Sequence, residues 1–177
     1  MCRHHGRFVS DVVFVVPYRD RAEHLSLFTE HIRDWGIPVR IVVVEQGQDR
    51  KFNRGALLNV GYNEAAAGGA RRVIFHDVDL LPDSTLLRMY FAPWPTPIVH
   101  FGARFERYNN TRAYLGGVLG VVVGPHFVGF SNLFFGWGGE DDSFYRRVDK
   151  RQIARPSQGA FIDLEGYTTV REKVRYL

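Results

Sequence analysis

The sequence predicts a single α/β domain with a mostly parallel central sheet flanked by helices. Short apolar runs rich in β-branched residues alternate with segments that repeat apolar residues at helical spacing. A chain of 177 residues also suits one domain with a full hydrophobic core. We expect residues 11–177 to form this domain, after a flexible N-terminus at residues 1–10.

The first half, about residues 11–82, is expected to begin with a buried strand, "DVVFVV", that is closed by Pro17. A helix should follow, because apolar residues recur at helical spacing before a glycine stop: Leu25, Phe28, Ile32, Trp35 and Gly36. "VRIVVVE" predicts a second buried strand. "NRGALLNVGYNEAAAGG" predicts a helix that ends at its paired glycines, and "RVIFH" predicts a third strand.

The second half, about residues 97–177, is less regular. "YLGGVLGVVV" predicts a glycine-rich strand and "FSNLFFGWGGEDD" an aromatic loop. "DSFYRRV" predicts a helix, and "QIAR" and "GAFIDLE" predict short strands. In parallel sheets ligands bind beyond the carboxyl ends of the strands, so the polar residues at those ends are the first candidates for a site.

Composition narrows the class of protein. The net charge of +4 suits a nucleic-acid binder, an enzyme that handles a diphosphate, or a solvated basic surface. We expect no nucleic-acid partner, because no basic stripe with interleaved aromatic residues is present. The single cysteine, Cys2, excludes an intramolecular disulfide. The apolar runs are too short to span a membrane and the start lacks a secretion signal, so we expect a cytoplasmic protein of unspecified oligomeric state.

"FHDVDLL" places Asp77 and Asp79 at the end of the third strand, where residues two apart point to the same side. Like charges there repel unless a cation, a hydrogen-bond network or water offsets them. The pair suits a hard cation such as Mg²⁺ or Mn²⁺. Alternatively, it caps the next segment, in which Pro82 and Asp83 begin a helix. The pattern alone leaves both interpretations open.

Two further acidic clusters follow. In "GWGGEDDSF", three acids at a helix start either satisfy the helix N-terminus or, together with Trp137, bind a polyhydroxylated ligand; we favour the ligand. In "FIDLEG", Asp163 and Glu165 suit the solvated face of an edge strand, or complete a metal site with Asp79. Arginines in "PYRDR" and "FNRG" suit a diphosphate and its nucleotide, or a soluble surface.

Several motifs together resemble the beta-1,4-galactosyltransferase family. They occur in the family's order over about residues 14–156: "VPYRDRAEHL", "FNRGALLNVGY", "FHDVDLLP", "YLGGVLG" and "GFSNLFFGWGGEDDSFYRR". The resemblance implies a nucleotide-sugar-binding fold of the GT-A type. It also implies metal dependence, usually on Mn²⁺ with Mg²⁺ as an option, and inverting transfer of galactose from UDP-galactose to a saccharide or glycoconjugate. The alternatives are another UDP-sugar donor, carrying N-acetylgalactosamine or glucose, and an inactive binding module.

The resemblance also implies roles for individual residues. Asp141 is the expected catalytic base, while Trp137 and Asp142 are expected to bind the acceptor. Trp137 and its neighbouring glycines are expected to form a lid. Residues expected to bind the donor are Pro17, Tyr18, Arg19, Arg21, Phe52, Arg54, Asp77, Val78, Tyr114, Gly117 and Glu140. A tyrosine at position 114 is associated in the family with galactose.

Asp79 is the expected metal ligand, and the resemblance indicates where its partners lie. Family members complete the site with a Met/His or His/His pair in the strand after an "RP" dipeptide. When "FIDLEG" is aligned on Phe161 and Leu164, the two histidines fall on Asp163 and Glu165. We therefore predict an all-oxygen metal site. The family's N-terminal anchor, disulfides and basic loop are not found in this sequence, which points to a bacterial or viral cytoplasmic member.

Overall fold

The computed structural model describes residues 11–47, 50–104 and 114–166, so the expected flexible N-terminus lies outside the described residues. In this part of the chain a six-stranded sheet has the order β2-β1-β3-β6-β5-β7, and β4 and β8 form a second, two-stranded sheet. The strands are β1 (Val12–Tyr18), β2 (Arg40–Glu45), β3 (Arg72–His76), β4 (Leu80–Pro82), β5 (Ile98–His100), β6 (Val118–Val122), β7 (Ile153–Ala154) and β8 (Phe161–Asp163). The helices are α1 (Ala22–Asp34), α2 (Arg54–Ala67), α3 (Ser84–Phe91) and α4 (Glu140–Arg147), with the short 3₁₀ turns η1 (Phe101–Ala103) and η3 (Lys150–Gln152).

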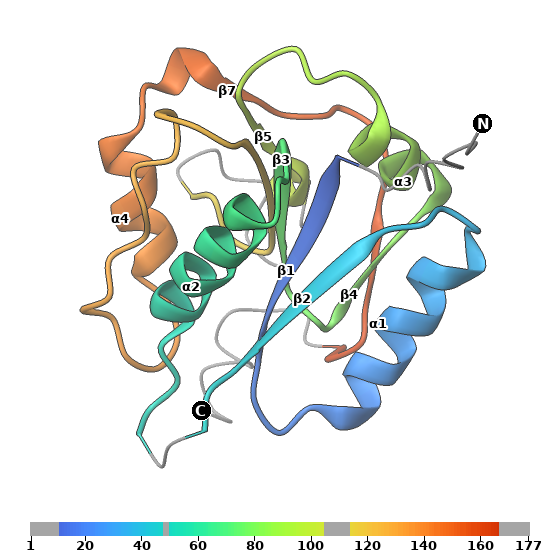
Figure 1. Cartoon of the computed structure of the whole chain (residues 1–177), viewed down its shortest axis with the longest axis horizontal. Helices are drawn as coiled ribbons and strands as arrows, with labels where there is room; N and C mark the ends of the chain where they lie inside the picture. The colour runs from blue at the N-terminus through green and yellow to red at the C-terminus, as the bar shows by residue number, and fades with distance from the viewer. Residues whose placement is uncertain (1–10, 48–49, 105–113, 167–177) are drawn as a thin grey trace, which may run out of the picture.

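The large sheet is mostly parallel, as the sequence predicts. β1 pairs in parallel with both β2 and β3, and β5 pairs in parallel with β7. β6 is antiparallel to both of its neighbours, β3 and β5. Within the described part of the chain, β6 is thus the one strand of this sheet that runs against the others. The carboxyl ends of β1, β2 and β3 therefore meet at one edge of the sheet (Figure 1).

Alternate residues of β1 face two separate cores, because successive side chains of a strand point to opposite faces. Phe14 packs with Phe28 of α1 and with the buried face of α3. Val15 packs with Leu58 of α2 and with Phe144 of α4. Figure 1 shows α2 and α4 on one side of the strands and α1 on the other. Helices thus cover both faces of the sheet, which completes the predicted architecture.

Gly61 of α2 allows that helix to lie close against β1. A Cβ at Gly61 would lie 2.2 Å from Cγ1 of Val15 and 3.0 Å from Cγ2 of Val44. Real Cβ contacts do not approach this closely, so any larger residue would push α2 away from the sheet. The residue before α2, Asn53, accepts a hydrogen bond from the backbone N–H of Ala56 at 3.0 Å and fixes the helix start.

Two strand predictions were wrong in detail. β1 continues through Pro17 to Tyr18 instead of closing at Pro17. Its alternation turns the nitrogen of Pro17 toward β3, and pairing with β3 has already ended at Val15, so the missing N–H costs no ladder hydrogen bond. β2 is not a buried strand: it lies at the edge of the sheet, and Val43 is 39% exposed.

The sequence pattern does not indicate two short strands, β4 in the first half of the chain and β5 in the second. β4 and β5 have three residues each, too few for a period to be seen. α4 begins at Glu140, two residues before the expected start, and places all three acids in its first turn. The predicted short strands appear as β7 and β8. Among the described residues, no helix is both long enough and apolar enough to cross a bilayer.

Candidate active site

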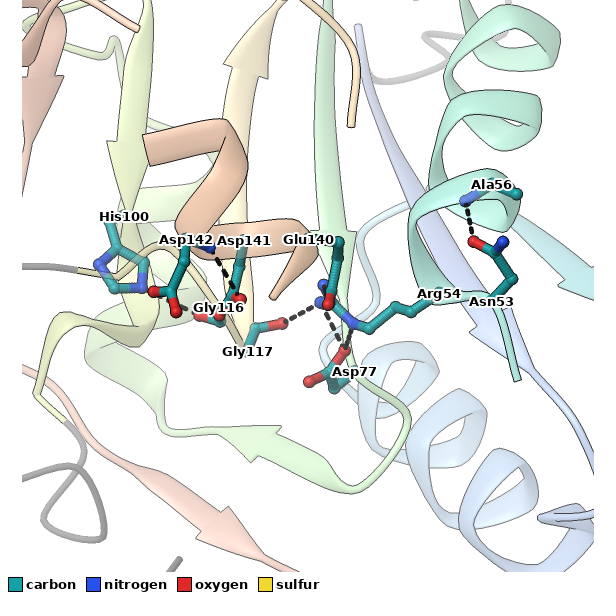
Figure 2. A network of polar contacts seen from close by, with 10 residues as sticks. All are labelled: Asn53, Arg54, Ala56, Asp77, His100, Gly116, Gly117, Glu140, Asp141 and Asp142. Atoms are coloured by element: carbon teal, nitrogen blue, oxygen red, sulfur yellow. Dashed lines mark hydrogen bonds and ion pairs between the residues drawn. The ribbon is translucent and has the colours of Figure 1, made fainter. Parts of the chain in front are cut away.

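A buried ionic network joins the end of β3 to the starts of α2 and α4. The guanidinium of Arg54, the first residue of α2, lies 2.8 Å from Asp77 Oδ1 through Nε and 3.1 Å from Glu140 Oε1 through Nη1. Its Nη2 also donates to the carbonyl of Gly117 at 3.4 Å. Figure 2 shows Arg54 at the centre of these groups. One side chain thus ties together three segments that are far apart in sequence.

The Arg54 network offsets the negative charge of Asp77 at the end of β3. Burial lowers the pKa of the Arg54 guanidinium, but the charges of Asp77 and Glu140 outweigh burial and raise it above its usual value. Arg54 therefore stays charged and pairs with both carboxylates. The expectation that Asp77 and Asp79 share one side of a strand was wrong. β3 ends at His76, and a turn closed by Leu80 N–H and the Asp77 carbonyl at 3.4 Å sends the two acids to different partners.

Asp141 lies next to this network, in the first turn of α4. Burial raises the pKa of the Asp141 carboxyl to about 6, and the neighbouring charge of Glu140 adds to the effect while Arg54 opposes it. Asp141 Oδ1 accepts a hydrogen bond from the backbone N–H of Asp142 at 2.9 Å. The carboxyl is therefore held in position and, at pH 7, is a base whose affinity for a proton is higher than usual.

A glycine provides the space that Asp141 occupies. A Cβ at Gly116 would lie 2.6 Å from Asp141 Oδ2. The carbonyl of Gly116 lies 2.9 Å from Nε2 of His100, whose burial lowers its pKa to about 4. His100 is therefore neutral at physiological pH and donates through Nε2 to that carbonyl. The motif "YLGGV" indicated this segment in the sequence, but it did not predict that Gly116 leaves space for the Asp141 carboxyl.

The aromatic loop before α4 is attached to α2 at both of its ends. Near its start, Asn59 exchanges hydrogen bonds with the backbone of Phe130, donating at 2.9 Å and accepting at 2.8 Å. The side-chain amide of Asn53 donates to the carbonyl of Asn132 at 2.8 Å. Toward its end, the N–H of Gly136 donates to the carbonyl of Phe52 at 2.7 Å. These contacts hold the loop at residues 130, 132 and 136.

Trp137 follows the fixed part of the loop. It is 39% exposed and lies between Gly136 and Gly138, whose φ angles are +91° and +88°. Gly139, at φ +95°, then leads into α4. These left-handed conformations suit glycine, and a run of such residues allows the backbone to change direction at Trp137. Asp142 is exposed and faces away from the Arg54 network.

Asp79, Asp163 and Glu165 form a third acidic group. Each offers one carboxylate oxygen, and the three oxygens lie within 4.8 Å of one another. The pairing of β4 with β8 brings them together, because the N–H of Leu164 donates to the carbonyl of Asp79 at 2.8 Å and the other two acids flank Leu164. Three carboxylate oxygens at this spacing fit a hard divalent ion such as Mn²⁺ or Mg²⁺.

The remaining predicted donor residues lie around the ends of β1 and α2. Arg19 lies over the ring of Phe52, with 5.3 Å between its Cζ and the ring centroid, and donates to the carbonyl of Arg50 at 2.6 Å. Arg21 forms an ion pair with Glu165 at 2.9 Å. Pro17 and Tyr18 end β1.

Like Glu140, two further predicted donor residues lie largely inside the fold. Val78 is buried, at 8% exposure, and Tyr114 is 7% exposed. The Tyr114 hydroxyl donates to the carbonyl of Gly102 at 2.9 Å. The structure therefore directs this hydroxyl toward the backbone of the turn η1.

Comparison with known proteins accounts for nearly all of the chain. A model described as the N-terminal region of glycosyl transferase group 7 matches residues 4–91, and one described as the N-terminal domain of galactosyltransferase matches residues 96–173. The chain belongs to the beta-1,4-galactosyltransferase family. The rat beta-1,4-galactosyltransferase 6 is 36% identical over 182 aligned residues, which cover 94% of this chain and 46% of the relative.

Solved structures of this galactosyltransferase family agree with the fold. The catalytic domain of Drosophila beta-1,4-galactosyltransferase 7 in complex with xylobiose has a TM-score of 0.71 and 34% identity, covering 83% of this chain and 65% of that one. A mutant of the same enzyme, in complex with manganese, UDP-galactose and xylobiose, has a TM-score of 0.71 and 33% identity. The chain spans about half the length of the curated relative that it matches.

Proposed function

We propose that this galactosyltransferase-family chain is a metal-dependent, inverting enzyme that moves galactose from UDP-galactose to a sugar hydroxyl. The observation that supports this most is Asp141, a half-buried carboxyl with its pKa raised to about 6, next to the Arg54 network. A carboxylate of this kind accepts a proton from a hydroxyl near neutral pH. The Drosophila enzyme bound to manganese, UDP-galactose and xylobiose supports the choice of donor, metal and acceptor class.

The proposed reaction is one displacement. The acceptor hydroxyl gives its proton to Asp141 while its oxygen forms a bond to the anomeric carbon of galactose. The bond from that carbon to the diphosphate breaks, and UDP leaves with the electron pair on the opposite face. Asp141 and Asp142 orient the acceptor against Trp137, and Glu140 binds donor hydroxyls from its fixed place beside Arg54. Asp79, Asp163 and Glu165 would hold a divalent ion, which would supply positive charge to neutralise a leaving diphosphate.

A thermal-shift screen of UDP-sugars, with and without Mn²⁺, distinguishes the proposed function from its alternatives. A ligand that binds the native state raises the melting temperature by mass action. We expect UDP-galactose to stabilise the protein in the presence of metal, and a transfer assay with xylosides and other glycosides to give a galactosylated product. A larger rise in melting temperature with UDP-glucose or UDP-N-acetylgalactosamine would indicate that this sugar nucleotide, and not UDP-galactose, is the donor. Binding without product formation, with Asp141→Asn equal to the wild type, would indicate an inactive module.

A further inference from the structure

Arg21 places a positive charge at the edge of the three-carboxylate group. It is the residue before α1, and its Nη2 lies 2.9 Å from Oε1 of Glu165. The two side chains differ in exposure: that of Arg21 is 42% exposed, whereas that of Glu165 is 4% exposed. The carboxylate is therefore fixed inside the protein, while the guanidinium, which also lies 3.4 Å from Nδ1 of His24, is the partner that reaches water.

A divalent ion bound by Asp79, Asp163 and Glu165 would lie close to the positive charge of Arg21. Glu165 belongs to the set of oxygens that lie within 4.8 Å of one another, so a bound ion and the guanidinium would share one carboxylate. Two cations at this spacing repel, and the carboxylate that pairs with arginine is a weaker ligand for the ion. Because Arg21 is the more exposed partner, its side chain is the one that can move away when the ion binds.

We propose that Arg21 acts as an internal counter-ion that lowers the affinity of this site for a divalent metal, because the ion has to displace it from Glu165. The inference rests on the metal site of the proposed function. It assigns Arg21 a role in the metal-free protein, which is to hold the carboxylates together until metal binds. The opposite role is that Arg21 orients Glu165 as a ligand and thereby strengthens metal binding, and the two roles predict opposite signs.

The test measures binding of Mn²⁺ alone, by the electron paramagnetic resonance signal of the free ion and by calorimetry, without nucleotide. We expect Arg21→Gln to bind Mn²⁺ roughly threefold more tightly than the wild type, the scale set by a partly exposed ion pair. Arg21→Lys keeps the charge and should stay within about twofold of the wild type. Arg33→Gln is the matched control, because Arg33 lies in the last turn of α1, about 18 Å along the helix from Arg21 and beyond the range of screened charges.

Thermal stability provides a second readout. Without metal, Arg21→Gln should melt at a lower temperature than the wild type, because the carboxylates lose their counter-ion. The rise in melting temperature on adding Mn²⁺ should be larger in the variant than in the wild type. Equal or weaker Mn²⁺ binding by Arg21→Gln would overturn the role of Arg21 and leave the metal site intact. No Mn²⁺ binding by any of the four proteins would overturn the metal site, and this inference with it.

Discussion

The Nε and Nη2 atoms of Arg54 lie 2.8 and 2.6 Å from the same carboxylate oxygen of Asp77. The other arm of the guanidinium reaches Glu140, which is only 5% exposed. An ion pair with this much burial is costly to break, because removal of one partner leaves the other charge without compensation.

Replacement of Arg54 by Met should therefore destabilise the protein strongly. We expect the free energy of unfolding to fall by roughly 2–4 kcal/mol, somewhat less than the ~3–5 kcal/mol typical of a fully buried pair, because the Asp77 side chain keeps 28% exposure. Urea unfolding followed by circular dichroism measures this. Arg146→Met, on the exposed face of α4, is the control and should change the free energy by less than about 0.5 kcal/mol. A loss below about 1 kcal/mol for the Arg54 variant would contradict the network.

Asp141→Asn should abolish transfer and stabilise the protein at neutral pH. The folded pKa of about 6 lies above the ordinary value of 3.8, so the native state favours the protonated form. That favourable contribution is fully present below about pH 3.8 and is lost as pH rises through 6. Asparagine resembles the protonated acid, so the variant should gain stability relative to the wild type above pH 6 and show no gain near pH 4.

The activity of the wild type should fall on the acid side of the same pKa. Protonation of Asp141 removes the base, so kcat/KM should decrease about tenfold for each pH unit below 6. A pH–rate profile with UDP-galactose and a xyloside measures this. A profile that stays flat down to pH 5 would rule out Asp141 as the base.

Gly116→Ala should displace the base without unfolding the protein. The new methyl group would lie 2.6 Å from Asp141 Oδ2, so the carboxyl has to shift. A displacement of about 1 Å in a catalytic group costs on the order of 10²-fold in rate. We expect kcat to fall by this order while the affinity for UDP stays near that of the wild type. An unchanged kcat would mean that the position of Asp141 beside Gly116 is unimportant.

The double variant Asp163→His and Glu165→His should shift metal preference. Imidazole nitrogens suit Co²⁺ and Zn²⁺, whereas carboxylate oxygens suit Mg²⁺ and Mn²⁺. The ratio of Co²⁺ to Mg²⁺ affinity, measured by calorimetry, should therefore rise in the variant. Alanine at both positions should remove metal-stimulated transfer. Full metal stimulation in the alanine variant would refute these two residues as ligands.

Asn59→Ala should loosen the loop that leads to Trp137. It removes hydrogen bonds from Asn59 to the backbone of Phe130 and to Asn132, and we expect a loss of about 1–3 kcal/mol in stability. Proteolysis near residues 133–135 should become faster, and the KM for the acceptor should rise. Asn63→Ala, on the exposed face of the same helix, is the control. Equal cleavage of both variants would show that Asn59 does not fix the loop.

Much of the first half was predictable because its signals are local. Phe28 and Ile32 repeat at helical spacing and lie on the buried face of α1. The paired glycines end α2 at Gly68. A helix does begin near Pro82, but Asp83 caps it, whereas the alternative interpretation had given the capping role to Asp77 and Asp79. In these cases the pattern of a few neighbouring residues decides the structure.

The candidate site was harder to predict because its contacts join distant segments. Nothing in the local sequence shows that Arg54 pairs with Asp77 and Glu140, at separations of 23 and 86 residues. The anchoring by Asn59 is equally invisible, since an asparagine within a helix is usually a solvated residue. By contrast, Asp163 and Glu165 were found because the family resemblance aligned them with two metal-binding histidines, and the structure brings them together with Asp79.

Interleaving of the two halves constrains how a chain of this kind can change its acceptor. β6 lies between β3 and β5, and β8 returns from the end of the described chain to pair with β4. A fragment cut between α3 and β5 would leave β3 without its neighbour β6 and β4 without its partner β8. We therefore do not expect either half to fold as a separate unit, whether it is grafted onto another protein or expressed as one fragment of a split protein. Under the proposed function, we expect new acceptor preferences to arise by changes in the connecting loops, with both halves of the scaffold retained.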